Sequence, residues 1–140
     1  MITIRRINMK SPKIRYSKQR ELILSNLKNR YDHPTAEMIY QDLKKENPHL
    51  SLGTVYRNLN QLCETKLINK IDVGNPMVHY DGNTDPHIHF ICQQCGQIID
   101  IDIDENAIVT QFQNHLHHHI KKIQIQMSGI CQNCSQDQAA

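Results

Sequence analysis

Four of the five cysteines in this 140-residue chain form two pairs, and two residues separate the cysteines of each pair. The pairs are Cys92-Gln-Gln-Cys95 and Cys131-Gln-Asn-Cys134. This spacing lets both sulfurs of a pair face one ion, and four thiolates complete the tetrahedral shell of Zn²⁺. We therefore expect a structural zinc site, with two disulfides or two redox pairs as the alternative. Cys63 stands apart and extends an apolar helix side, which indicates a small buried residue.

A second group of candidate ligands contains no sulfur. In His87-Ile-His89 the two imidazoles would lie on one face of a strand. Asp81 lies in the expected linker, Asp100 ends the next expected strand, and His33 precedes the second expected helix. Three nitrogens and two carboxylates form a harder site than four sulfurs. Such a site can hold Fe²⁺ or Mn²⁺ with an open coordination position.

His33 has two interpretations. A lone histidine before a proline is usually a solvated loop residue. If His33 is a ligand instead, the ligand set comes from both halves of the chain and from the linker. Metal would then lock the N-terminal half at one angle to the C-terminal half. Whatever the N-terminal half binds would then be coupled to metal binding through this arrangement.

The two halves of the chain carry opposite charge. Residues 1–70 contain fourteen Lys and Arg against six Asp and Glu, and residues 71–140 contain two against eight. A basic half suits a polyanion such as nucleic acid, and an acidic half rich in His and Cys suits cations. The alternative is two solvated surfaces that differ in composition.

The composition argues against a membrane protein. The chain has no run of about eighteen apolar residues, and residues 1–10 lack the apolar core of a signal peptide. We expect a cytoplasmic protein, where cysteine pairs more often bind metal than form disulfides.

The segment 51–60 combines two properties of a DNA-reading helix. An apolar stripe would dock it on the preceding helices: Val55, Leu59 and Leu62. The other face can reach phosphates and base edges through Thr54, Tyr56, Arg57 and Asn60. Arg57 could fork onto a guanine, while Tyr56 offers its ring to a thymine methyl and its hydroxyl to a phosphate. Further phosphate contacts are expected from Lys13, Arg15, Lys18 and Arg20. An ordinary amphipathic surface helix is the alternative.

Caps and apolar spacing predict three helices and then a hairpin, the element order of a winged helix-turn-helix. The first helix follows Ser17 and ends near Asn29, the second begins at Pro34-Thr35, and the third follows Ser51. Strands are expected over 66–73 and 77–80.

The remaining chain predicts a second, smaller unit. Strands are expected over 88–91 and 97–101, a helix over about 104–117, and a strand over 120–127 in which apolar residues alternate. The fold class is therefore α+β. It comprises a winged-helix domain over 1–80 with a basic N-terminal arm, a hinge over 81–86, and an α/β domain over 87–140. His115 and the run His117-His-His119 indicate a solvated turn or an auxiliary metal site.

The chain resembles the ferric-uptake-regulator (Fur) family over about residues 13–135. The resemblance rests on four segments: His33-Pro-Thr-Ala-Glu-Met-Ile-Tyr40, Ser51-Leu-Gly-Thr-Val-Tyr-Arg-Asn-Leu59, His87-Ile-His89 with Ile91-Cys-Gln-Gln-Cys-Gly96, and Gly129-Ile-Cys-Gln-Asn-Cys134. It implies a transcriptional repressor that dimerises through its C-terminal domain and binds AT-rich palindromic operators. It also implies that His33 is the inter-domain metal ligand. An enzyme is a competing interpretation, but no cofactor motif and no acid–base pair occur outside the metal ligands. A zinc-stabilised protein-interaction module is another, against which the basic N-terminal half argues.

Within the family, the ligand set resembles that of the peroxide-sensing (PerR) branch, which uses three His and two Asp. Iron-sensing members commonly have Glu where Asp81 and Asp100 stand. The resemblance implies that bound Fe²⁺ reacts with hydrogen peroxide, that His33 or His87 is oxidised, and that DNA is released. Mn²⁺ would support repression without this chemistry. Arg57 departs from the branch, which often has Asn there. The alternative is an iron-, manganese- or zinc-responsive repressor without peroxide sensing.

Overall fold

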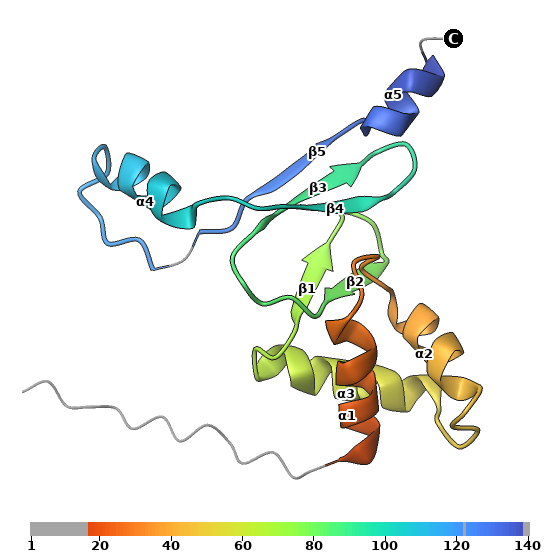
Figure 1. The fold of residues 1–140 in the computed structure, drawn as a ribbon. Coiled ribbons are helices and arrows are strands. Elements are labelled where there is room, and N and C mark those ends of the chain that lie inside the picture. The colour runs from red at the N-terminus through yellow and green to blue at the C-terminus, as the bar shows by residue number, and fades with distance from the viewer. Residues whose placement is uncertain (1–16, 122, 139–140) are drawn as a thin grey trace, which may run out of the picture.

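The computed structural model describes residues 17–121 and 123–138. Its N-terminal part contains three helices, α1 (Lys18–Lys28), α2 (Ala36–Lys44) and α3 (Leu52–Glu64), followed by the antiparallel hairpin β1 (Asn69–Asp72) and β2 (Val78–Asp81) (Figure 1). This is the element order of a winged helix-turn-helix. The expected α+β fold class is confirmed.

Each of the three helices begins where a hydroxyl side chain caps it. The hydroxyls of Ser17, Thr35 and Ser51 accept hydrogen bonds from backbone N–H groups three residues later. These bonds satisfy donors that the first helical turn leaves free. The predicted helix starts are therefore confirmed. They could be predicted because a cap and the N–H group that it accepts lie three residues apart in the sequence.

One apolar core holds the three helices against β2. Its members come from the three helices, from β2 and from the loops between them: Ile23, Leu27, Ala36, Ile39, Leu50, Val55, Leu59, Leu62, Ile68 and Tyr80. Tyr80 is 2% exposed, and burial raises the pKa of its phenol to about 12. The predicted apolar stripe of α3 lies within this core, so the opposite side of α3 faces outward.

The C-terminal part is built on a three-stranded sheet with the order β4-β3-β5 (Figure 1). β3 (Ile88–Cys92) pairs antiparallel with β4 (Ile98–Ile101) and parallel with β5 (Gln126–Gly129). Between β4 and β5, α4 (Glu105–Gln113) projects away from the sheet. α5 (Gln132–Gln138) follows β5. The first two strand predictions, 88–91 and 97–101, are confirmed within one residue at every bound.

Two predicted elements of this part are wrong in their bounds, and α5 was not expected. The helix expected over 104–117 ends at Gln113; α4 buries none of its described side chains, and residues 114–119 are all exposed. No packing therefore favours a longer helix. The strand expected over 120–127 is β5, which spans only Gln126–Gly129. It forms where the edge of β3 is available, from His89 to Cys92.

The expected linker is ordered. Asp81 is the last residue of β2 rather than a linker residue, and its Oδ1 accepts the backbone N–H of Asn83 at 2.8 Å. Gly82 lies against the end of α1, where a Cβ would come within 2.6 Å of the Leu27 carbonyl oxygen. Asn83 in turn accepts from the N–H of Asp85. These contacts fix the chain as it passes from β2 towards β3.

An apolar cluster joins the two parts. Ile71 of β1 packs with Ile91 of β3 and Ile98 of β4, and Val73 lies against them. In Figure 1 the hairpin β1–β2 lies between the helices and the three-stranded sheet. Within residues 17–121 and 123–138, every helix is too short or too polar to span a bilayer.

Candidate metal centre and nucleic-acid interface

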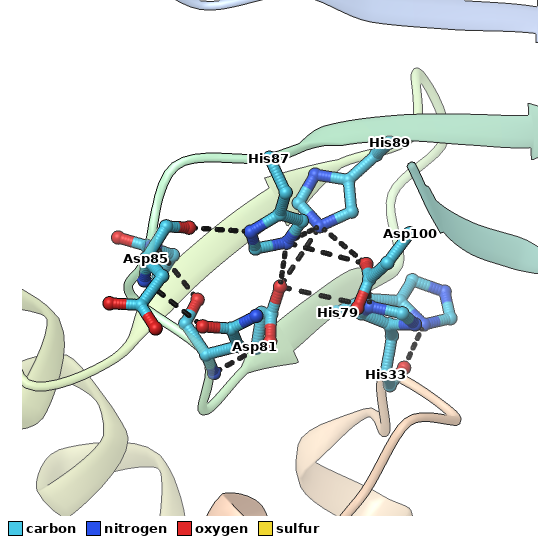
Figure 2. A network of polar contacts seen from close by, with 9 residues as sticks. His33, His79, Asp81, Asp85, His87, His89 and Asp100 are labelled. Atoms are coloured by element: carbon cyan, nitrogen blue, oxygen red, sulfur yellow. Dashed lines mark hydrogen bonds and ion pairs between the residues drawn. The ribbon is translucent and has the colours of Figure 1, made fainter. Parts of the chain in front are cut away.

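Five side chains predicted as ligands meet between the two parts of the molecule (Figure 2). His33 comes from the loop before α2 and Asp81 from the end of β2. His87 precedes β3, His89 lies within it, and Asp100 lies opposite His89 on β4. The structure thus brings together all five residues of the sulfur-free set.

The ligand atoms of these residues lie at the spacing of a coordination shell. Asp81 Oδ2 is 2.8 Å from His87 Nε2 and 2.9 Å from His89 Nε2, and these two nitrogens are 2.9 Å apart. Asp100 Oδ1 is 2.7 Å from His33 Nε2, 3.3 Å from His87 Nε2 and 3.2 Å from His89 Nε2. Neighbouring octahedral ligands about 2.1 Å from one ion stand about 3.0 Å apart. The ligand atoms of His33, Asp81, His89 and Asp100 all lie within 4.8 Å of one another and fit a single divalent cation, and His87 contacts the same Asp81 oxygen from one side of this group.

The charge and burial of the cluster also fit a cation. Burial raises the pKa of Asp81, but hydrogen bonds from His89, from the Asn83 backbone and from His87 outweigh it and lower the pKa overall. Burial lowers the pKa of His87, but its hydrogen bonds to the Asp85 carbonyl and to Asp81 outweigh that effect and raise the pKa. Two carboxylates held among nitrogen ligands give the cluster a net attraction for positive charge.

Hydrogen bonds fix the orientation of His87. Its Nδ1 donates to the carbonyl oxygen of Asp85 at 2.6 Å, which leaves Nε2 directed at Asp81. A carbonyl that holds the far nitrogen of an imidazole is the usual support of a metal-binding histidine.

His33 is held in an unusual backbone conformation. Its φ is +48°, a left-handed value that few residues other than glycine adopt. The carbonyl oxygen of His33 accepts a hydrogen bond from His79 Nδ1 at 2.7 Å, and that of Pro34 accepts from the N–H of Tyr80 at 2.9 Å. His33 is 2% exposed, and its Nδ1 has no hydrogen-bond partner among the residues that the structure describes. The interpretation of His33 as a solvated loop residue is therefore wrong.

His79 is a residue that the sequence analysis missed. It neighbours Tyr80 in β2, two residues before Asp81, and touches the ligand set through the backbone of His33 (Figure 2). The only signal in the sequence is its proximity to Asp81, because a side-chain bond to a carbonyl 46 residues away has no local pattern.

The four predicted zinc ligands also converge. Cys92 ends β3, Cys95 lies in the following turn, Cys131 precedes α5 and Cys134 lies in α5. Their sulfurs all lie within 4.8 Å of one another, and those of Cys95 and Cys131 are 3.9 Å apart. Four sulfurs bound tetrahedrally at about 2.3 Å stand about 3.8 Å apart. All five cysteines are free of disulfides, so the disulfide alternative is not observed.

The charges of this cluster suit a bound cation. The backbone N–H groups of Cys95 and Cys131 donate to Cys92 Sγ and lower its pKa to about 6. The hydrogen bond with Cys131, burial and the other sulfurs raise the pKa of Cys134 to about 12. Four thiolates cannot coexist here without a positive ion between them. Cys63 is separate and is half-buried rather than fully buried as predicted, and burial raises the pKa of its thiol.

The predicted DNA-reading residues lie on the outward side of α3. Tyr56, Arg57 and Asn60 are exposed and Thr54 is half-buried. Arg57 Nη2 donates to Thr54 Oγ1 at 3.0 Å.

Of the four predicted phosphate contacts, two can be placed. Lys18 is exposed at the start of α1, whereas Arg20 is half-buried and its Nη2 donates to Gln61 Oε1 on α3. Lys13 and Arg15 lie outside the described residues.

The sequence and the fold resemble known regulators. The model of the Ferric uptake regulator family matches residues 11–128. The peroxide-responsive repressor PerR of Staphylococcus aureus (strain Mu50 / ATCC 700699) is 32% identical over 127 residues, which are 86% of this chain and 82% of that protein. The peroxide stress regulator of Campylobacter jejuni is 36% identical with a TM-score of 0.69, over 83% of this chain and 88% of that chain. The ferric uptake regulator Fur of Helicobacter pylori, whose structure is described as revealing three functional metal-binding sites, is 26% identical with a TM-score of 0.73, over 87% of this chain and 83% of that chain.

The family match covers most of the chain and includes the segments that supply the five ligands and α3. Members of this family are transcription regulators and not enzymes. The protein belongs to the ferric uptake regulator family.

Proposed function

We propose that the protein is a metal-dependent transcriptional repressor that binds operator DNA as a homodimer and senses hydrogen peroxide. The observation that carries the proposal is the cluster of three histidines and two aspartates between the two parts of the chain. The cluster contains only nitrogen and oxygen ligands, which suit Fe²⁺ or Mn²⁺. The similarity to peroxide regulators of two organisms supports the same conclusion.

The placement of the ligands supports a coupling of metal to DNA binding. His33 and Asp81 belong to the part that carries α3, whereas His87, His89 and Asp100 belong to the second part. A shared cation would stabilise one orientation of α3 relative to the dimer body. Two DNA-reading helices in a dimer must match half-sites at a fixed spacing, so this orientation controls operator affinity.

His33 and His87 are the ligands at which oxidation would release DNA. Bound Fe²⁺ would supply the electrons that reduce hydrogen peroxide and so produce an oxidant beside these side chains. A cleft of about 560 Å³ is lined by His87 and His89 and would admit a small molecule to these two ligands. Oxidation of His33 would remove a ligand whose backbone is held in a strained conformation directly before α2.

The four cysteines would hold a structural Zn²⁺ with no open position. This ion would join the end of β3 to the start of α5 and would not take part in sensing.

The experiment that tests the proposal loads the zinc-containing protein with Fe²⁺ or Mn²⁺ and measures binding to duplexes selected from a random pool. Binding is measured before and after brief exposure to dilute hydrogen peroxide, and the same samples are analysed by mass spectrometry. We expect loss of binding only with Fe²⁺, together with the gain of one oxygen on the peptide of His33 or His87. His115→Ala, which removes an exposed histidine of the C-terminal part, is the matched control and should behave as the wild type.

A different outcome would identify the second candidate function. Metal-dependent binding that ignores peroxide would make the protein an iron-, manganese- or zinc-responsive repressor. The departure at Arg57 and the similarity to Helicobacter pylori Fur favour this candidate.

A further inference from the structure

A hydrogen bond at the surface ties α2 to the outward side of α3. The hydroxyl of Tyr56 donates to Glu37 Oε1 at 2.5 Å. Glu37 is the second residue of α2 and Tyr56 the fifth of α3. Both side chains are exposed, so the bond forms beside the surface that carries Arg57 and Asn60.

The Glu37 carboxylate is anchored independently of Tyr56. It lies in the first turn of α2, where the positive end of the helix dipole stabilises a negative charge. Thr35 caps the same turn by accepting the N–H of Met38. The bond to Tyr56 lowers the pKa of Glu37 and raises the pKa of Tyr56. The contact is therefore a charge-assisted bond from a neutral phenol to a carboxylate, which is stronger than a neutral one.

This bond limits what Tyr56 can do at DNA. A phenol has one proton to donate, and Glu37 already accepts it. The hydroxyl consequently has no proton left for a phosphate, and the carboxylate next to it repels phosphates. The part of Tyr56 that remains available to DNA is its ring. Tyr56 is 37% exposed.

We propose that Glu37 is a positioning residue that holds the ring of Tyr56 against a thymine methyl group and keeps its hydroxyl away from the phosphates. The inference rests on the proposed binding of operator DNA by α3. Tyr56 was already expected to contact a thymine methyl; the inference adds that Glu37, a residue of α2, controls this contact and excludes the expected phosphate contact of the hydroxyl.

The test measures how much one thymine methyl contributes to binding. Mn²⁺-loaded wild-type protein selects duplexes from a random pool, and each thymine of the selected site is then replaced in turn by deoxyuridine. We expect about fourfold weaker binding at one position of each half-site, the effect of losing one buried methyl group. Glu37→Ala and Tyr56→Phe should both abolish this difference. Glu37→Gln, whose amide oxygen still accepts the phenol proton, should retain most of it.

Two controls separate positioning from general effects. Glu46→Ala removes another exposed carboxylate of the same part and should keep the fourfold difference. The salt dependence of binding should be the same for Tyr56→Phe and the wild type, because the hydroxyl makes no phosphate contact.

The outcomes distinguish this inference from the proposed function. Glu37→Ala protein that still distinguishes thymine from deoxyuridine, or a shallower salt dependence for Tyr56→Phe, would overturn the positioning role alone. A wild-type protein that is insensitive to every deoxyuridine substitution would do the same. Wild-type protein that selects no duplex would overturn the repressor proposal and this inference together.

Discussion

The three histidines of the metal centre are held by different means. His87 is oriented by the carbonyl of Asp85, and His89 by its place in β3 opposite Asp100. His33 depends on backbone contacts, because its left-handed conformation must be maintained against strain of about 1–3 kcal/mol. The bond from His79 to the carbonyl of His33 is one of these contacts. His79 thus acts on the site through another residue.

His79→Ala is expected to weaken metal binding although all five ligand residues are retained. Without the bond from His79, the loop before α2 has less to hold His33 in position. Loss of such a supporting residue typically costs about 10- to 100-fold in metal affinity. A Mn²⁺ titration of the zinc-containing protein measures the effect. His49→Ala removes an exposed histidine of the same part and serves as the control; equal affinities in both variants would show that His79 is dispensable.

Metal affinity is also expected to depend on pH through His87. Its raised pKa means that the metal-free protein retains the imidazolium to a higher pH than a free histidine would. Metal must displace this proton, so the Mn²⁺ dissociation constant should rise as the pH falls through the raised pKa, by about tenfold per unit below it. The lowered pKa of Asp81 keeps its carboxylate ionised throughout. Titrations between about pH 8 and pH 5.5 measure this dependence, and a constant affinity over this range would contradict it.

The ligands themselves could be predicted from residue type and spacing, whereas their supports could not. A His-x-His strand and a set of Asp and His residues indicate coordination chemistry directly. His33 was ambiguous because its burial results from the packing of two distant segments. His79 and Glu37 act through single hydrogen bonds over 46 and 19 residues, and no spacing in the sequence encodes such contacts.

At the scale of whole helices and strands, bounds that depend on neighbouring residues were predicted correctly, whereas bounds that depend on distant residues were not. Helix starts were predictable because a cap lies within three residues of the N–H group that it accepts. The extent of β5 could not be predicted, because β5 forms along the short edge of β3 from His89 to Cys92. α4 has an apolar side with half-buried Ile108 and Val109, but no described element packs closely on it. Its length could not be inferred from periodicity alone.

The elements at the end of the chain depend on the cysteine site. Among the described strands β5 pairs with β3 alone, and the next residues along the chain include Cys131 and Cys134. Cys134→Ala should therefore abolish zinc binding and lower the free energy of unfolding by at least about 2 kcal/mol, because zinc binding contributes to folding. Zinc content and denaturant unfolding measure the effect. Cys63→Ala is the matched control and should retain one zinc per chain; a Cys134→Ala protein with full zinc content would contradict the assignment.

Arg57 is the residue of α3 best suited to read a base. It is exposed, and its bond to Thr54 holds the guanidinium along the outward side of the helix. Arg57→Ala should weaken binding to the selected duplex by about 1–3 kcal/mol if the guanidinium forks onto a guanine. Competition with duplexes altered at single positions measures this loss. A loss that is equal on all sequences would identify a phosphate contact instead.

At the scale of the whole molecule, two kinds of contact align the N-terminal and C-terminal parts. One is the polar cluster that a cation would bridge, and the other is the apolar packing of Ile71 against Ile91 and Ile98. The apolar contact does not require metal, so it would bring His33 and Asp81 close to the other ligands before metal binds. Such prior alignment lowers the conformational entropy that the ligands lose when metal binds.

Ile71→Ala should therefore lower both the free energy of unfolding and the affinity for metal, although none of the residues in the apolar cluster of Ile71 is a metal ligand. Ile71 is 3% exposed, and truncating such a residue costs about 2–5 kcal/mol of unfolding free energy. The Mn²⁺ dissociation constant should rise as well, in proportion to the fraction of molecules whose two parts have separated. Ile99→Ala, at a β4 residue that is 36% exposed, should change both quantities little. If Ile71→Ala lowers the free energy of unfolding but keeps the wild-type Mn²⁺ affinity, the metal ligands align the two parts and the apolar cluster is not needed for this alignment. In that case the apolar cluster contributes to folding alone, and the proposed coupling of DNA binding to metal would depend only on the ligands.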